Sequence, residues 1–478
     1  DLRAAILDRA PAAVELVCIM PSSAGAVAAG VRDVHAAGRR AFVVATSEEV
    51  GRAAEAAGAD AVIAKGHEAG GWVGEESAFV LLQRLIARLN VPVWAWGGVG
   101  LHTAAACAVA GAAGVVLDNQ LLLTRESPLP EPTRARIRSM DGSETVSLGG
   151  DLGAQLRVYS RPGLAPVDQL RDIATSIALA GHEPAQALGL WRAAVREAVG
   201  WADQDRHALA IGQDAAFAGH LADRFVTVGG VVEAIRASVV DNMRVAQELN
   251  PLAEGSPLAM SHGVQYPIVQ GPMTRVSDRA EFAAAVASAG ALPFLALALM
   301  RANEVDALLD ETERLLGDRR WGVGVLGFVP SALRAEQLEV IRRYRPPFAL
   351  IAGGRPDQAR SLEADGIATY LHVPSPGLLA LYLKDGARVA GTSDRGPASS
   401  SGIRWCEPFW PTSRGSSTRP SFTCSSLAAS TMPRRRRWSQ RSRRRSRRMA
   451  FASASCSAPH ICSLTRRWPR RQSRRDSR

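Results

Sequence analysis

Two stretches of the chain alternate short apolar runs with segments whose apolar residues recur at helical spacing. In residues 1–125 the runs are VELVCI, AFVVAT, ADAVIAKG, VPVWAWGG and AGVVLDNQLLL, and residues 264–389 hold a second set from YPIVQG to TYLHVPS. Segments between them, such as SEEVGRAAEAAG and NEVDALLDETERLLG, have the spacing of amphipathic helices. Near-continuously apolar strands that alternate with helices indicate parallel sheets buried on both faces. About 25 residues per strand–helix unit fits a TIM barrel or a doubly wound sheet.

The rest of the chain has other patterns. Residues 165–250 show amphipathic helical spacing with no strand pattern between the helices, and NPLAEGSPLAMSHG after them has the composition of a linker. Residues 392–478 show no periodicity, and their composition indicates disorder. We therefore expect an α/β fold with partial (β/α)8 TIM barrels in tandem. Its four parts are the C-terminal part of a first barrel (1–164), a helical connector and linker (165–255), the N-terminal part of a second barrel (256–391) and an Arg-rich disordered tail (392–478).

Composition narrows the classes of function. The chain of 478 residues has a formal net charge of +11, but from Thr392 onward it holds 21 Arg, no Lys and 3 acidic residues, so the remainder is mildly acidic. No apolar stretch reaches the ~18 residues that a membrane span needs, and the start lacks the features of a signal peptide. Because the first residue is Asp1, we expect a fragment of a longer protein. Cys18 and Cys107 lie in apolar contexts typical of small core residues, which indicates a reducing, cytoplasmic compartment.

Several glycine-rich motifs follow predicted strands. Pro267–Ser277, PIVQGPMTRVS, places a Gly-Pro-Met turn where backbone N–H groups and a soft Met side chain could lie against a flat aromatic cofactor, although any strand-to-helix turn can use Gly and Pro. Ala64–Gly74 and Trp94–Gly100 place paired glycines after strands, and Gly114–Thr124 is the last strand end of the first set. Paired glycines permit close approach of a phosphate or a flavin edge. Two such strand ends on adjacent units resemble the phosphate site of many TIM barrels.

Taken together, these motifs resemble the nitronate monooxygenase (2-nitropropane dioxygenase-like) flavoprotein family. PIVQGPM, GVGVLGF and FALIAGGRP are similar to its N-terminal half, whereas ADAVIAKGHEAGG, VPVWAWGGVG and GVVLDNQLLL are similar to its C-terminal half. The sequence around GPMTRVS, IAGGRPDQAR and YLHVPSPGLL resembles tandem copies of this domain in modular type I polyketide synthases. In those proteins a segment similar to AIGQDAAFA joins the two copies. Related barrels are flavin enoyl reductases of polyunsaturated fatty acid synthases.

The resemblance implies an FMN site in this chain. The turn of the family that contacts FMN matches Gly271, Pro272 and Met273. The polar residue before the glycine loop of the family matches Lys65. The paired glycines of that loop match Gly70 and Gly71, and the pair that binds the phosphate matches Gly97 and Gly98.

Two departures from the family bear on catalysis. In the family a His follows the glycine pair and takes the proton α to the nitro group, but that position is Trp72 here, and Trp cannot accept a proton. His67 lies five residues earlier and is a weak substitute. The Met-Gly-Thr end of the last strand is replaced by Leu117–Asn119, so that Asp118 would repel a phosphate. We therefore expect the first copy to be catalytically altered.

The Arg-rich tail has two explanations. Such a tail can bind nucleic acid. Alternatively, the reading frame has shifted: back-translation of Val389–Gly396 from the third base of Val389 can give Gly-Gly-His-Val-Gly-Pro-Arg, the missing site signature with its base. In the same frame Phe422–Thr431 and the segment from Met449 can give the missing Gly-Gly strand end and the last strand. Three motifs in the family order favour the frameshift, so we expect no nucleic-acid partner.

Two functions remain open at this point. The first is an FMN-dependent oxidoreductase module, nitronate oxidising or enoyl reducing, from a polyketide or fatty acid synthase, impaired in this chain. The second is a non-catalytic structural segment of that megasynthase. Either would have other synthase domains as partners, and the first would take a small-molecule or acyl-carrier-bound substrate. We expect no metal and no membrane association, and the sequence leaves open whether the two half barrels complement each other.

Overall fold

The computed structural model describes residues 10–11, 13–201 and 206–384. The predicted disordered tail and its back-translated motifs lie outside the described residues. Within the described part of the chain, no helix combines the length and apolar character needed to cross a membrane.

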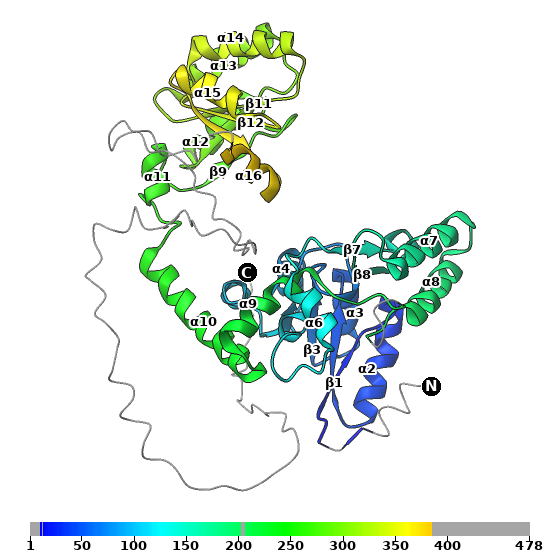
Figure 1. The fold of residues 1–478 in the computed structure, drawn as a ribbon. Helices are drawn as coiled ribbons and strands as arrows, with labels where there is room; N and C mark the ends of the chain where they lie inside the picture. The colour runs from blue at the N-terminus through cyan, green and yellow to red at the C-terminus, as the bar shows by residue number, and fades with distance from the viewer. Residues whose placement is uncertain (1–9, 12, 202–205, 385–478) are drawn as a thin grey trace. The chain divides into compact units, whose positions relative to one another are not determined.

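The first five apolar runs form one parallel sheet. Its strands are β1 (Leu16–Ile19), β2 (Arg40–Ala45), β3 (Ala61–Lys65), β5 (Val93–Trp96) and β6 (Gly114–Val116), and they pair in that order. The connections are α2 (Val27–Ala36), α3 (Glu48–Ala56), α4 (Ala78–Arg88) and α5 (Thr103–Ala110), as Figure 1 shows in blue to cyan. Buried Val31, Val43 and Leu85 belong to the core that joins the strands to these helices. The predicted parallel half barrel is confirmed.

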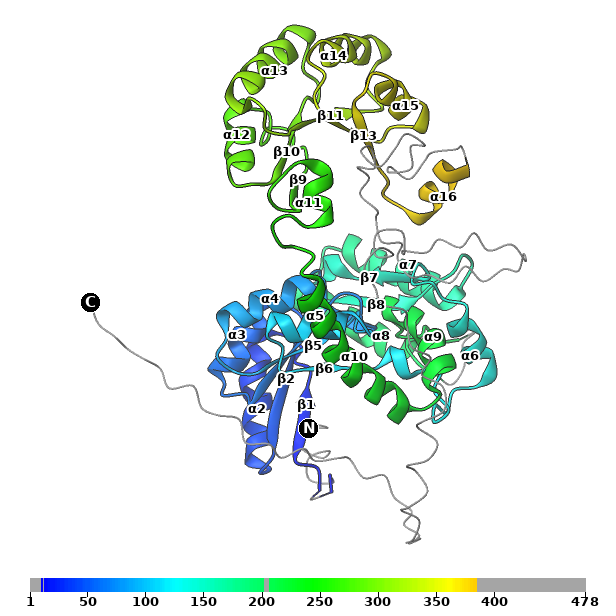
Figure 2. The same cartoon turned by 90° about the vertical axis from the view of Figure 1, so that its left-hand side faces the viewer.

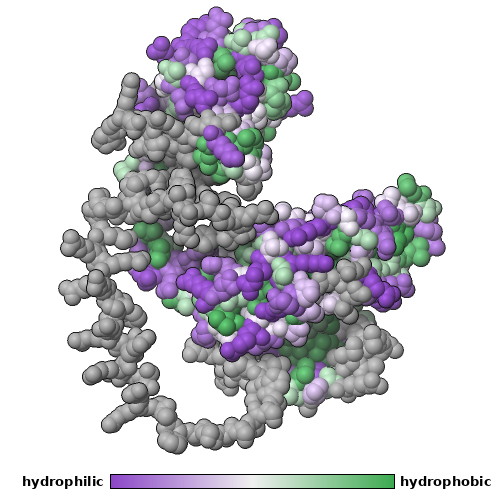
Figure 3. Space-filling model, in the orientation of Figure 1, coloured by the Kyte–Doolittle hydropathy of each residue, from purple (hydrophilic) through white to green (hydrophobic). Residues whose placement is uncertain are grey.

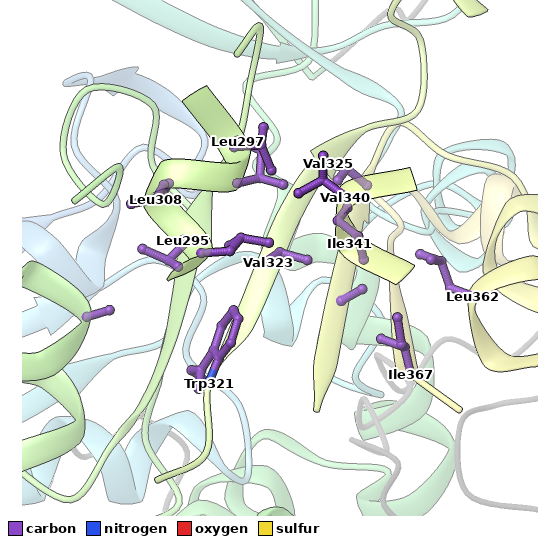
Figure 4. Packing of buried hydrophobic residues seen from close by; sticks show 14 of the residues in the cluster. Leu295, Leu297, Leu308, Trp321, Val323, Val325, Val340, Ile341, Leu362 and Ile367 are labelled. Atoms are coloured by element: carbon purple, nitrogen blue, oxygen red, sulfur yellow. The ribbon is translucent and has the colours of Figure 1, made fainter. Parts of the chain in front are cut away.

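The second set of runs forms a separate parallel sheet of the same kind. Its strands, paired in chain order, are β9 (Val269–Gln270), β10 (Leu292–Ala296), β11 (Gly322–Leu326), β12 (Phe348–Ala352) and β13 (Ala368–His372). The helices are α12 (Ala280–Ser288), α13 (Ala302–Leu316), α14 (Ser331–Tyr344), α15 (Pro356–Ala364) and α16 (Pro376–Lys384). Figure 2 shows α12 to α15 as an arc outside the strands. The core between the layers includes Leu295, Val323 and Ile341 (Figure 4).

The helical connector is also confirmed. It contains α7 (Ala165–Leu179), α8 (Pro184–Ala198), α9 (Ala216–Phe225) and α10 (Val228–Leu249). Leu221 of α9 and Val231 and Ile235 of α10 pack with Val99 and Ala104, which follow β5. The end of the connector therefore packs against the first sheet. The residue boundaries that we assign to the four parts of the chain remain a prediction.

The segment that we interpreted as a linker contains a helix. α11 (Pro257–His262) has Pro at its first turn and ends at Gly263, whose φ of +65° suits glycine. The buried ring of His262 stacks on Phe348, and its Nε2 lies 2.5 Å from the hydroxyl of Tyr370. The linker prediction was wrong here because Ser, Pro and Gly are also the residues that begin and end helices.

A three-stranded antiparallel sheet was not predicted. It consists of β4 (Gly71–Val73), β7 (Thr145–Leu148) and β8 (Gln155–Tyr159), in the order β4-β8-β7. β4 lies in the loop after β3, so the glycine motif leads directly into this sheet. α6 (Glu131–Arg138) precedes β7.

The two cysteines differ from each other in burial. Cys107 on α5 is buried, as we expected. Cys18 on β1 is exposed, so its assignment as a core residue was wrong. β1 is an edge strand of the first sheet, with β2 as its neighbour in the pairing order, and side chains on an edge strand are covered from fewer sides.

Candidate functional site

The carboxyl ends of β3 and β5 bring the predicted glycine motifs together. The backbone N–H of Gly66, just after β3, donates to the carbonyl of Trp96 at the end of β5 (2.8 Å). A Cβ on Gly97 would lie 3.4 Å from both the carbonyl oxygen of Gly66 and the nitrogen of Ala69. Because parallel strands end at the same edge, the two loops meet there, where ligand sites of α/β barrels form.

Lys65 is held inside this edge. Its Nζ donates to the carbonyl of Gly70 at 2.8 Å and lies 4.2 Å above the centre of the Trp96 ring. Burial lowers the pKa of the Lys65 ammonium to about 8, while the carboxylates of Asp118 and Asp214 act in the opposite direction. Lys65, which we predicted to bind the cofactor, therefore donates its hydrogen bond to the glycine loop of this chain.

The paired glycines of that loop approach the connector rather than an open space. A Cβ on Gly70 would lie 2.4 Å from the carbonyl oxygen of Ala210, and a Cβ on Gly212 would lie 2.3 Å from that of Glu68. The N–H of Gln213 donates to the Glu68 carbonyl at 2.8 Å. The close backbone approach that glycine permits is thus used by the AIGQDAAFA segment.

The second glycine pair donates to a carboxylate of the same segment. Gly97 and Gly98 have φ of +109° and +63°, and the Gly98 N–H donates to Oδ2 of Asp214 at 3.2 Å. Nδ2 of Asn119 donates to Oδ1 at 2.8 Å, and Nε2 of Gln120 donates to Oδ2 at 3.1 Å. The side chains of Asp214, Asn119 and Gln120 are all buried.

The environment of Asp214 disfavours its charge. Burial, and next the carboxylate of Asp118, raise the pKa of Asp214 to about 7, against the opposing effect of its hydrogen bonds from Asn119 and Gly98. Asp118 accepts from the N–H of Asn119 at 2.5 Å and precedes the short helix η2 (Asn119–Leu121). Burial also raises the pKa of Asp118. Sequence reasoning missed Asp214, although an acid among the apolar residues of AIGQDAAFA was a usable signal.

Trp72, at the base position of the family, belongs to the antiparallel sheet, and the substitute His67 contacts that sheet at Arg157. Trp72 pairs with Leu156 across β4 and β8, and its ring meets Trp191 edge-on with centroids 6.4 Å apart. Arg157 lies over His67: its Nε donates to the His67 carbonyl at 2.6 Å, and one guanidinium nitrogen lies 3.0 Å from Nδ1. Burial, and then the charge of Arg157, lower the pKa of His67.

The Gly-Pro-Met turn lies at the corresponding edge of the second sheet. A Cβ on Gly271 would meet no atom within 4 Å, and the side chain of Met273 is 45% exposed. Pro272 packs on Gly324, where a Cβ would come within 2.3 Å of the Pro272 ring. The predicted cofactor residues thus form two groups, one at the edge of each sheet.

The first group does not fit the phosphate of FMN as it is folded here. The N–H of Gly98 is already directed at the Asp214 carboxylate, and a phosphate would lie beside the carboxylates of Asp214 and Asp118. In the second group, Gly271 and Met273 are open to the surroundings, which fits a flat aromatic cofactor. Its described contacts include no cluster of N–H donors that could hold a phosphate, and the Met273 N–H donates to Ser277.

Comparison with known proteins agrees with the motifs. Residues 14–237 match the family model of nitronate monooxygenase. The chain is 43% identical over 79 residues to the (3aS,4S,5R,7aS)-5-hydroxy-7a-methyl-1-oxo-octahydro-1H-indene-4-carboxyl-CoA dehydrogenase of Rhodococcus jostii, covering 16% of this chain and 22% of that protein. It is 32% identical over 148 residues to the Mycobacterium tuberculosis protein of the same name, covering 29% and 41%. The chain therefore spans less than half the length of these curated relatives.

Among solved structures, FabK from Thermotoga maritima is 27% identical, with a TM-score of 0.41, over 52% of this chain and 74% of that one. The matched family is one of flavin-dependent oxidoreductases. Residues 14–237 are therefore similar to the nitronate monooxygenase family, as the motifs predicted.

Proposed function

We propose that the chain is part of an FMN-dependent oxidoreductase module, of the nitronate monooxygenase or enoyl reductase type, from a polyketide or fatty acid synthase, and that its first copy is impaired. Other synthase domains are its proposed partners, its proposed substrate is a small molecule or an acyl group on a carrier, and its proposed compartment is the cytoplasm. The family match over residues 14–237 supports the reaction class. The observation that carries the impairment is the environment of Trp72.

Proton abstraction needs an acceptor within hydrogen-bond reach of the substrate carbon. The indole of Trp72 donates only, and it belongs to an apolar cluster with Trp191. The ring of His67 lies against the Arg157 guanidinium, whose positive charge makes the imidazole a weaker base. Trp72 therefore supplies no proton acceptor, and His67 supplies only a weakened one.

A second function, a non-catalytic structural segment of the synthase, is favoured by two observations. The connector packs against the glycine loop at Gly70, so the backbone of the chain itself covers this loop. In addition, the α7–α8 hairpin exposes Ile173, Leu179 and Leu190, and Figure 3 shows apolar surface at its tip. Apolar groups that cluster on a protruding element are typical of contacts with another domain.

The test measures retained flavin absorbance and oxygen consumption with propionate nitronate after incubation with FMN. For an impaired module, Trp72→His in a chain that retains FMN restores a proton acceptor and raises turnover about 10²–10⁴-fold over the unmodified chain. Trp94→His, which changes a half-buried Trp on β5, is the matched control and stays at the unmodified rate. A chain that retains no flavin and shows no turnover in any form supports the structural function, whereas rapid turnover by the unmodified chain contradicts the impairment.

A further inference from the structure

Asp214 is a buried carboxylate whose hydrogen-bond partners are neutral N–H groups from two other segments. Its side chain is 2% exposed, and it accepts from Gly98, Asn119 and Gln120 at 2.8 to 3.2 Å. Burying a carboxylate costs free energy unless donors replace its water shell. The three donors therefore surround the carboxyl oxygens of Asp214 in place of water.

The donors have the form of an oxyanion site. Two successive glycines with positive φ, Gly97 and Gly98, follow β5 and turn a backbone N–H towards Asp214. Such a turn makes a concave group of N–H donors that suits anions. The amides of Asn119 and Gln120 complete it, and Gln120 is fixed because Nε2 also donates to the Val99 carbonyl (3.0 Å).

We propose that the carboxylate of Asp214 occupies the phosphate site of the first copy as an internal oxyanion, and that removal of this carboxylate opens the site to inorganic phosphate. The identification of the glycine pair as a phosphate site rests on the proposed function. The presence of an oxyanion site that accepts a small anion rests on the donors alone.

Packing of the connector holds Asp214 in place. Ala215, Ala218 and Leu221, which follow it, are buried, and Gly212 before it packs against the backbone of Glu68. A tethered group competes as if it were present at high local concentration. A free phosphate therefore cannot displace Asp214 from the intact chain at ordinary concentrations, which explains why the phosphate of FMN does not fit.

The experiment is a thermal unfolding titration of the full chain with inorganic phosphate, against chloride at matched ionic strength. Asp214→Ala leaves the donors of Gly98, Asn119 and Gln120 in place and removes the internal anion. Phosphate is expected to raise the Tm of this variant saturably, by about 5 °C at saturation, because a ligand that binds only the folded state stabilises it. Formate, which replaces the lost carboxylate, is expected to act in the same way.

Three controls are expected to show no such rise in Tm with phosphate. The unmodified chain retains its internal anion, and Asp214→Asn fills the space without the charge. Asp223→Ala removes an exposed carboxylate of α9, whose side chain is 66% exposed. If Asp214→Ala does not fold alone, it is refolded in formate or in chloride, and recovery in formate only supports the proposal.

The proposal is overturned if phosphate and formate act on Asp214→Ala no more than chloride does, or if phosphate stabilises the unmodified chain equally. No flavin enters this titration. If Asp214→Ala binds phosphate but Trp72→His combined with Asp214→Ala shows no turnover, the internal oxyanion stands and the impaired-module function fails. If the variant with Trp72→His shows turnover but Asp214→Ala binds no phosphate, the internal oxyanion fails and the impaired-module function stands.

Discussion

The side-chain nitrogen of Lys65 donates a hydrogen bond to the carbonyl of Gly70 at 2.8 Å. This contact closes the glycine loop over the end of β3, and the same ammonium lies above the ring of Trp96. In the family that the sequence resembles, the matching polar residue belongs to the cofactor site. In this chain its hydrogen bond supports the loop that β4 continues.

Replacement of Lys65 by Met tests this role. The apolar stem is retained, but the buried carbonyl of Gly70 loses its donor, which costs about 1–3 kcal/mol of unfolding free energy. Urea unfolding of the full chain measures the loss. Lys384→Met, at an exposed position on α16, is the matched control and changes the free energy by less than about 0.5 kcal/mol. Equal effects of the two substitutions would show that the Lys65 contact adds nothing.

The raised pKa of Asp214 predicts how stability depends on pH. Because its folded-state pKa is about 7 and the ordinary value is 3.8, the folded state binds the proton more tightly. The contribution of protonated Asp214 is therefore fully present below about pH 4 and is lost as pH rises through about 7. The charges that act on it include Asp118 and Glu68, and Lys65 titrates above this window.

The measurement compares urea unfolding of the unmodified chain and of Asp214→Asn between pH 4 and 7. Asn does not titrate, so the fall in stability across this range is expected to be smaller in the variant. Asp223→Asn, at an exposed carboxylate, is expected to keep the slope of the unmodified chain. Parallel curves for the unmodified chain and Asp214→Asn would contradict the shifted pKa.

The strands of both parallel sheets were predictable from the sequence, whereas the antiparallel sheet was not. β3 and β10 are buried along their whole length, and each is apolar throughout except for Lys65 at the end of β3. β4 has three residues, two of them half-buried, and is too short for a period to show. Its partner β8 follows much later in the chain, and Gly71 pairs with Arg157, 86 residues further on.

The candidate site was also predictable only in part. A glycine after a strand often marks a backbone conformation that other residues avoid. The motif alone therefore placed Gly97 and Gly98 in the turn after β5. The burial of Asp214 depends on contacts with residues 94 to 116 positions away, at Gly98, Asn119 and Gln120. No local pattern contains that information.

The hydrogen bond between His262 and Tyr370 ties α11 to β13. Tyr370→Phe keeps the ring packing but leaves Nε2 of buried His262 without this partner, which costs about 1–3 kcal/mol. Hydrogen exchange of peptides from α11 and β13 is expected to become faster. Tyr266→Phe, which removes a hydroxyl bonded to the exposed Gln265, is expected to leave both peptides unchanged. Unchanged exchange in Tyr370→Phe would mean that stacking on Phe348 alone holds α11.

The contact between Gly324 and Pro272 predicts how the Gly-Pro-Met turn responds to a single methyl group. Gly324→Ala would place a Cβ 2.3 Å from Cβ of Pro272, closer than real carbon contacts, so the turn must move. Overpacking of this kind costs about 1–3 kcal/mol. Hydrogen exchange at residues 271–277, where the Met273 N–H donates to Ser277 Oγ, is therefore expected to become faster. Gly377→Ala, on α16 with open space around its Cβ, is the matched control and leaves these peptides unchanged. If Gly324→Ala also leaves them unchanged, the turn is not supported by β11, and the ring of Pro272 is free to shift without loss.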